Sequence, residues 1–232
     1  MKRIPRRAAQ SLYNFPTYTI PEAALYLAVP TSTLRYWLKN HPLWKIAERE
    51  DRYTLLSFRD IAQAYYIEMA RRHFNLTLTQ MRDVLIEAAK ESSSQYPLLQ
   101  KNILVHAKHV LMDKRRRGKS PRRLIDLSRH RQLALPEIVA PLSTRILWDK
   151  GKIVQLFPWR YWTGKEEDKT RPVSINPEVM SGRLVITGTR IPVQIVLQRN
   201  RDGETVSEIA KDYKLSTSSI NQAIKHLVQQ AA

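Results

Sequence analysis

A short stretch near the amino terminus, "TSTLRYWLK", carries side chains that could bind a nucleic acid. If the stretch is helical, Leu34, Trp37 and Leu38 share one apolar face. The opposite face then holds hydroxyl, phenol and cationic groups: Thr31, Ser32, Thr33, Arg35, Tyr36 and Lys39. Such groups on one short helix can contact base edges in the major groove, so we expect these six residues to bind DNA.

The preceding residues predict the helix that would position this stretch. In "YTIPEAALYLAV", Thr19 is a candidate helix cap, Pro21 lies in the first turn, and Glu22 would complete a capping box. Ala28 and Val29 would form a turn, after which Thr31 could cap the second helix. The sequence therefore predicts a helix-turn-helix.

The next segment, "LWKIAEREDRYTLLSF", alternates apolar and polar residues on both sides of a charged tip. This pattern predicts a two-stranded wing whose Arg49 and Arg52 would contact DNA as well. Ser57 with Asp60 should cap a third helix, and a fourth should begin at Thr77 or Thr79.

The helix-turn-helix pattern occurs a second time, in "TVSEIAKDYKLSTSSINQAIKHL". Without any gap, Thr205, Glu208 and Thr217 match Thr19, Glu22 and Thr31. The second helix of this copy would expose polar but weakly charged side chains: Ser218, Ser219, Asn221, Gln222 and Lys225. Two interpretations stay open, a further DNA contact or a structural or dimer-forming module.

Composition agrees with a nucleic-acid partner. The 232 residues include 39 Lys and Arg against 21 Asp and Glu, a net charge of +18 that favours a polyanion. Zero cysteines exclude disulfides and thiolate zinc sites, and the six histidines lack metal-ligand spacing on a helix. We therefore expect no metal and no cofactor. We also expect no enzymatic activity, because no Ser/His/Asp order, glycine-rich phosphate loop or carboxylate pair at usable spacing occurs. No apolar run or leader pattern predicts a membrane span or a secretory signal, so we expect a cytoplasmic protein.

The middle of the chain changes from helical to strand-like patterns. "NILVHAKHVLMD" and "LIDLS" flank "KRRRGKSPRR", which predicts a hairpin with a basic tip. The candidate phosphate contacts on this tip are Arg115, Arg116, Arg117, Lys119, Arg122 and Arg123. A merely solvated loop is an equally good interpretation. "LALPEIVAPLSTRI" predicts a short helix, and "RILWDKGKIVQLFPWRYW" predicts a second hairpin with Gly151 at its turn.

The tail contains "LVITGTRIPVQIVL", a strand-to-helix corner. Leu184, Val185 and Ile186 should form a short buried strand, and Gly188 should allow a tight turn. Pro192 should start a helix whose apolar residues are Val193, Ile195, Val196 and Leu197. We expect Arg190 to hold the corner by hydrogen bonds.

Three resemblances follow from these motifs. "YTIPEAALYLAVPTSTLRYWL" and "LLSF" make about Thr17 to Ala89 similar to the DNA-binding domain of the MerR superfamily. "INPEVMSGRLVITGTRIPV" resembles a small bacterial domain of unknown function that is often found in antitoxins. With "LIDLSRHRQLAL" between them, the tandem resembles VapB-type antitoxins paired with PIN-domain ribonuclease toxins.

The resemblance to VapB-type antitoxins implies that antitoxin side chains, commonly Arg, block an acidic metal-binding site on the toxin. Arginine suits this role because its forked donors pair with carboxylates. The candidate toxin contacts are Trp159, Arg160, Arg171 and Arg190. The partners implied are operator DNA, a PIN-domain ribonuclease toxin, and either a second copy of the chain or a hetero-oligomer with the toxin.

The sequence thus predicts a mainly α fold with short β-hairpins, in which a MerR-like winged helix-turn-helix, an α+β middle region and a C-terminal helix-turn-helix domain follow one another. The predicted divisions are a basic arm (1–16), the DNA-binding domain (17–92), the middle region (93–162), a linker (163–172) and the tail domain (173–232). The predicted function is that of an antitoxin that binds its operator and neutralises a PIN-domain nuclease. The alternative is a stand-alone MerR-like regulator or architectural DNA-binding protein.

Overall fold

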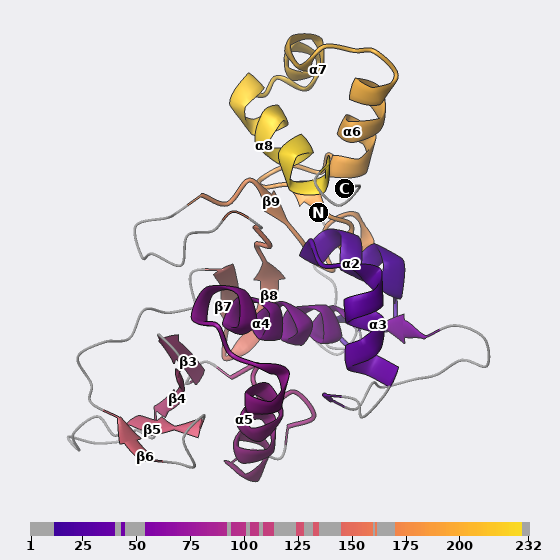
Figure 1. Cartoon of the computed structure of the whole chain (residues 1–232). Coiled ribbons are helices and arrows are strands. Elements are labelled where there is room, and N and C mark those ends of the chain that lie inside the picture. The colour runs from indigo at the N-terminus through magenta and orange to yellow at the C-terminus, as the bar shows by residue number, and fades with distance from the viewer. Residues whose placement is uncertain are drawn as a thin grey trace, which may run out of the picture.

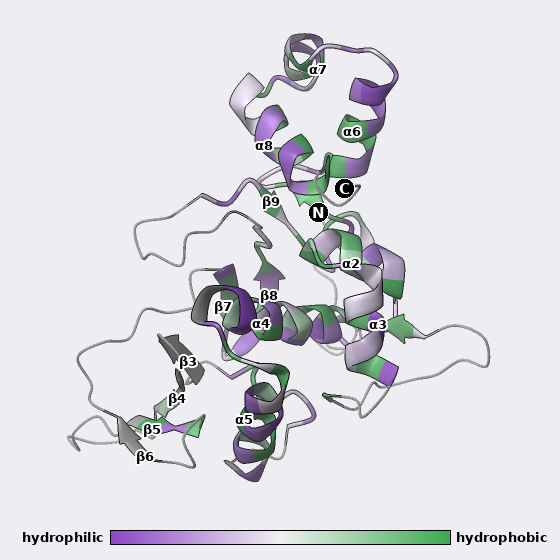
Figure 2. Cartoon of the chain, in the orientation of Figure 1, coloured by the Kyte–Doolittle hydropathy of each residue, from purple (hydrophilic) through white to green (hydrophobic). Residues whose placement is uncertain are grey.

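A computed structural model describes residues 12–39, 43–44, 54–91, 94–100, 103–106, 109–113, 124–127, 132–134, 145–159, 161 and 170–228. In these residues the fold is mainly helical with short antiparallel strand pairs, as the sequence predicts (Figure 1). Figure 2 shows hydrophobic and hydrophilic residues interspersed along α5, α6 and α7, the pattern of helices that bury one side.

The head of the molecule contains two short strands and four helices in the described residues. Their bounds are β1 Tyr18–Thr19, α2 Ile20–Leu27, α3 Thr31–Lys39, β2 Leu55–Leu56, α4 Phe58–Phe74 and α5 Leu78–Glu91. Helices α2 and α3 form the predicted helix-turn-helix, and α4 passes beneath α2 (Figure 1).

Local hydrogen bonds fix the turn between α2 and α3. Thr19 caps α2 by accepting from the Glu22 amide, but the capping box is incomplete because Glu22 Oε1 accepts from the Tyr26 hydroxyl at 2.7 Å. Ala28 adopts a left-handed conformation (φ 54°), and its N–H reaches back to the carbonyl of Ala24. Helix α3 begins at Thr31 itself, after Pro30.

Helices α4 and α5 begin where the sequence predicts. Ser57 and Asp60 form a complete capping box that is fully buried, and Asp60 Oδ1 also accepts from Trp44 Nε1 at 2.8 Å. Of the two candidate caps for α5, Thr77 is used, since its hydroxyl accepts from the Gln80 amide at 3.2 Å.

The segment predicted as the second strand of the wing ends in a short strand of the head. Leu55 and Leu56 pair antiparallel with β1, with Tyr18 opposite Leu56. The apolar side chain of Leu56 is fully buried, which draws this segment to the core of the head. The tip of the wing, with Arg49 and Arg52, lies outside the described residues.

The middle region holds an antiparallel sheet of four strands in chain order. These are β3 Ile103–His106, β4 His109–Asp113, β5 Leu124–Asp126 and β6 Gln132–Ala134. The pairing of β4 with β5 is the predicted hairpin, whose basic tip lies outside the described residues. Leu133 and Ala134 belong to β6, so the short helix predicted from these residues onward is wrong at its start; residues 135–144 are not described.

The second predicted hairpin is confirmed. Strand β7, Ile146–Asp149, pairs antiparallel with β8, Lys152–Leu156. Lys150 and Gly151 both have positive φ at the turn, which is the conformation that two-residue hairpin loops require.

The tail comprises β9 Val173–Ser174, a 3₁₀ turn η3 Met180–Gly182, β10 Val185–Ile186, and the helices α6 Val193–Arg201, α7 Val206–Tyr213 and α8 Thr217–Val228. The predicted strand and the positive φ of Gly188 (80°) are confirmed.

One expectation about the tail is wrong. The corner is held by Thr189, whose hydroxyl donates to the Ile186 carbonyl and accepts from the Ile191 amide, whereas Arg190 is exposed. Ile195 is 47% exposed, since the helix buries only Val193, Val196 and Leu197.

Candidate nucleic-acid interface

Helix α3 buries one side and exposes the other as the sequence predicts. Leu34, Trp37 and Leu38 are no more than 1% exposed. Ser32, Arg35, Tyr36 and Lys39 are exposed, Tyr36 by 51%, while Thr31 and Thr33 are half-buried. The outer surface of α3 therefore combines two cations, a phenol and a hydroxyl without any carboxylate.

Two arginines of α4 hold this helix-turn-helix in place. The Arg71 guanidinium lies 5.4 Å from the centroid of the Trp37 ring of α3. Arg72 donates to the carbonyl of Ala28 at 3.3 Å, in the turn, and forms an ion pair with Glu68 at 2.8 Å. Sequence reasoning missed these contacts, because a pair of arginines on a helix looks like an ordinary solvated face.

Tyrosines of the head donate hydrogen bonds to the tail. The Tyr18 hydroxyl donates to the Gly182 carbonyl at 3.0 Å, and the Tyr13 hydroxyl donates to Glu178 at 3.2 Å. Burial raises the pKa of Tyr18, and burial together with Glu178 raises the pKa of Tyr13 to about 12, so both phenols stay protonated donors at neutral pH. A side chain at Gly182 would meet the Tyr18 hydroxyl oxygen at 2.0 Å, so only glycine fits there.

A buried histidine completes the contact between head and tail. His226 of α8 is fully buried, and its Nε2 lies 3.0 Å from the Tyr26 carbonyl of α2. The ring stacks on Trp159 with centroids 5.9 Å apart. Trp159 is only 6% exposed, so it is a core residue, and the expectation that it contacts a toxin directly is corrected.

The other candidate toxin contacts lie on or near the tail surface. Arg171 is exposed just before β9, and its guanidinium lies 4.6 Å from the centroid of the Phe157 ring. Arg190 is exposed at the corner between β10 and α6. Arg160 lies outside the described residues.

The predicted second helix-turn-helix is present in the tail. Thr205 caps α7 in a complete capping box with Glu208. Lys214 has the left-handed conformation of Ala28 (φ 53° against 54°), and the Leu215 amide donates to the Ala210 carbonyl at 2.9 Å, as Val29 donates to Ala24 at 3.0 Å. The two units share one hydrogen-bonding pattern.

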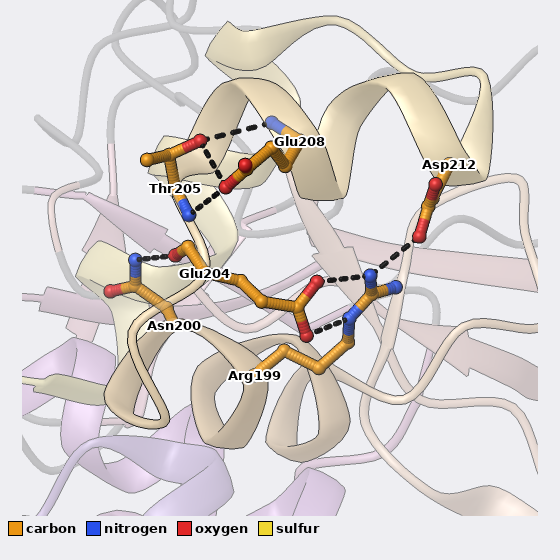
Figure 3. A network of polar contacts seen from close by, with 6 residues as sticks. All are labelled: Arg199, Asn200, Glu204, Thr205, Glu208 and Asp212. Atoms are coloured by element: carbon orange, nitrogen blue, oxygen red, sulfur yellow. Dashed lines mark hydrogen bonds and ion pairs between the residues drawn. The ribbon is translucent and has the colours of Figure 1, made fainter.

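A polar network joins α6 to α7 in the tail (Figure 3). Arg199 binds both carboxylate oxygens of Glu204, through Nε at 2.7 Å, and reaches Asp212 at 2.5 Å. The hydrogen bonds from Arg199 lower the pKa of Glu204, and those from the side chain and backbone of Thr205 lower the pKa of Glu208. Sequence reasoning missed Arg199, whose partners lie five and thirteen positions away.

Two families match parts of the chain. Residues 18–87 match the family described as MerR HTH family regulatory protein, and residues 173–226 match the family described as protein of unknown function (DUF433). The chain thus carries a MerR-type helix-turn-helix domain at its amino terminus and a DUF433 domain at its carboxyl terminus. No curated protein matches the chain.

A solved structure is similar to this chain over most of the length of both proteins. The X-ray crystal structure of Rv2018 from Mycobacterium tuberculosis covers 90% of this chain and 97% of its own, with 19% identity and a TM-score of 0.62. This likeness establishes a common fold that extends over both domains and the region between them.

Within the part of the chain that the structure describes, every helix is too short or too polar to span a membrane. Nor do three or more His, Cys, Asp or Glu side chains gather there in a way that could hold a metal ion.

Proposed function

We propose that this protein is a transcription regulator that binds operator DNA with the outer face of α3. The observation that carries the proposal is the exposed set of Ser32, Arg35, Tyr36 and Lys39 on the second helix of a MerR-type domain. Arginine and lysine bind guanine edges or phosphates, and the hydroxyls bind either. Thr31 and Thr33, and Arg49 and Arg52 of the wing, add to this surface in the proposal.

The test is a titration of the full chain with duplex DNA from its own promoter region. We expect tight binding that survives an excess of unrelated duplex, since specific affinity exceeds non-specific affinity by about 10³ or more. Equal affinity for promoter and unrelated DNA would overturn sequence-specific regulation.

Within this function we propose that the regulator is an antitoxin whose partner is a PIN-domain ribonuclease. Support comes from the resemblance of the whole tandem to VapB-type antitoxins and from the exposed position of Arg171 and Arg190. An exposed guanidinium can pair with two oxygens of an acidic nuclease site. In this proposal the chain acts in the cytoplasm by binding alone, without catalysis, as a homodimer or as a hetero-oligomer with the toxin.

Co-expression with a nuclease encoded beside the gene tests the antitoxin proposal. We expect the two proteins to co-purify in a fixed ratio with the nuclease inactive, and Arg171→Ala with Arg190→Ala to restore nuclease activity. The matched control is Arg183→Ala, another exposed arginine of the tail. A nuclease that stays unbound and fully active would refute the antitoxin function and leave operator binding intact.

A stand-alone MerR-like regulator is the second candidate, favoured by the family match over residues 18–87. Both candidates bind an operator, so DNA binding does not separate them. Affinity purification from native cell extract does: a stoichiometric nuclease supports the antitoxin, and DNA without a protein partner supports the stand-alone regulator.

A further inference from the structure

The second helix-turn-helix places hydrogen-bonding groups at the positions where the first places its candidate DNA contacts. Because the two units align without a gap, Ser218 stands where α3 has Ser32, Asn221 where it has Arg35, and Lys225 where it has Lys39. Ser218, Asn221 and Lys225 are exposed, as are their counterparts in α3. Ser219 and Gln222 are half-buried.

We propose that α8 is a second DNA-reading helix and that it favours adenine through Asn221 and Gln222. Asparagine and glutamine side chains can accept from N6 and donate to N7 of adenine in one bidentate contact. Ser219 is less available, because its amide and hydroxyl already contact the Ser216 hydroxyl at 3.1 and 2.8 Å. Asn221 makes no intramolecular side-chain hydrogen bond among the described residues.

The two helix-turn-helix units carry the same formal charge. Thr19–Lys39 carries Arg35 and Lys39 against Glu22, and Thr205–Lys225 carries three lysines against Glu208 and Asp212, so each has a formal charge of +1. In the tail the two carboxylates are engaged at the joint between α6 and α7, Asp212 with Arg199 and Glu208 with Thr205 (Figure 3). Lys211 and Lys214 are exposed at the end of α7 and in the turn, where phosphate contacts are common in this motif.

The contact between head and tail fixes the distance between the two reading helices. His226, four residues after Gln222 on α8, is buried against the Tyr26 carbonyl of α2, and Figure 1 shows α8 next to α2. Tyr18 and Gly182 add a second buried contact. An operator read by both helices should therefore contain two unlike sub-sites at a set spacing.

The experiment selects binding sequences from random duplexes with the full chain and then compares variants on the selected operator. We expect Asn221→Ala to lower affinity on the order of 5- to 150-fold and to remove the preference for adenine at one sub-site only. The Arg35→Ala variant should remove base preferences at the other sub-site. The matched control is Gln194→Ala, which truncates an exposed amide on α6 outside the unit.

Spacing supplies an independent readout. Inserting about 5 base pairs, half a helical turn, between the sub-sites should lower affinity as much as the Asn221→Ala variant does, because the second sub-site then faces away. Wild-type affinity on the longer operator would contradict a rigid two-helix contact.

The outcomes distinguish this proposal from operator binding by α3. If Asn221→Ala left the base preferences unchanged while Arg35→Ala altered them, the proposed role of α8 would be overturned and that of α3 would stand. The reverse result would overturn α3 and keep α8. If Asn221→Ala weakened only the co-purification of a nuclease, α8 would be a protein surface and the DNA proposal would be wrong.

Discussion

Arg35 and Tyr36 are exposed to solvent because the apolar residues beside them on α3 are buried in the core and fix the orientation of the helix. Leu34 and Trp37 take the buried positions of the helix, and the guanidinium of Arg71 on α4 packs on the Trp37 ring. A base contact needs a side chain that is exposed but whose backbone is held firmly. The buried face of α3 fixes its backbone, and the exposed face presents the side chains that would contact DNA.

Truncating Arg35 tests the base contact directly. We expect Arg35→Ala to weaken operator binding by about 1–3 kcal/mol, since the variant removes a bidentate donor from a groove contact. Fluorescence anisotropy titration measures the loss, and circular dichroism checks that the helices persist. Arg190→Ala, which truncates an exposed arginine of the tail, should leave DNA affinity as it is. Equal affinities for Arg35→Ala and wild type would place recognition elsewhere.

At the scale of elements, α4 is the platform of the head. Its amino terminus is anchored by the buried pair Ser57 and Asp60, and Asp60 also accepts from Trp44. Tyr96 approaches the Ser57 hydroxyl at 3.3 Å, and burial with the nearby Asp60 raises the pKa of Tyr96 to about 12. The start of α4 thus organises the segments on both sides of it.

Removing the buried cap should therefore cost more than removing an exposed one. We expect Ser57→Ala to lower the free energy of unfolding by about 1–2 kcal/mol, because the Asp60 amide and carboxylate both lose the hydroxyl. The control is Thr77→Ala at the exposed start of α5, which should cost less. Urea denaturation of both variants measures the difference, and equal losses would show that burial of the cap adds nothing.

The joint between α6 and α7 should make the tail sensitive to acid. The pKa values of Glu204 and Glu208 are lowered from the ordinary value of 4.5, so the stability that they contribute is present above that value and is lost as pH falls through the lowered pKa. Thermal melts at low salt should show that the melting temperature decreases as the pH drops below about 4.5.

In the Glu208→Gln variant this decrease should be shallower, since Gln does not titrate. The control Asp83→Asn, at an exposed position on α5, should retain the wild-type profile; an unchanged profile in Glu208→Gln would contradict the assignment.

At the scale of the whole molecule, the two domains form one core. Leu156 of β8 and Ile175 exchange backbone hydrogen bonds at 2.9 and 2.8 Å, which links the β7–β8 hairpin to the tail. The fully buried Arg145 donates to the Thr170 carbonyl at the end of the predicted linker. His226 and Tyr18 join the tail to the head. We infer that head, hairpin and tail unfold together.

Removing the buried histidine should loosen this assembly. We expect His226→Ala to lower the free energy of unfolding by about 1–3 kcal/mol, since it deletes the stacking on Trp159 and the contact with the Tyr26 carbonyl. Calorimetry should show two transitions in place of one as the domains uncouple. Gln194→Ala, at an exposed position, should melt like wild type. A single transition at the wild-type temperature in His226→Ala would refute the coupling.

The net charge of +18 should act on DNA through the basic segment of the middle region. Replacing Arg115, Arg116 and Arg117 together by Ser should lower affinity equally for all duplexes and reduce the dependence of binding on salt, because fewer counterions are released. Titrations at several salt concentrations measure the slope. A slope equal to that of wild type would mean that this segment is only solvated.

Local signals in the sequence predicted much of the fold. The caps at Thr19, Ser57 and Thr205, the turn at Gly188 and the repeated helix-turn-helix follow from neighbouring residues, whose conformational preferences act over one or two turns of chain. The outward face of α3 followed from helical periodicity in the same way.

Tertiary structure decided what depends on partners far away in the chain. Leu56 pairs with Tyr18, the Tyr18 hydroxyl meets Gly182 across 164 positions, and His226 meets Tyr26 across 200. Burial likewise made Trp159 a core residue and left Arg190 exposed. These outcomes depend on which apolar surfaces cover one another when the chain folds, and no short stretch of sequence carries that information.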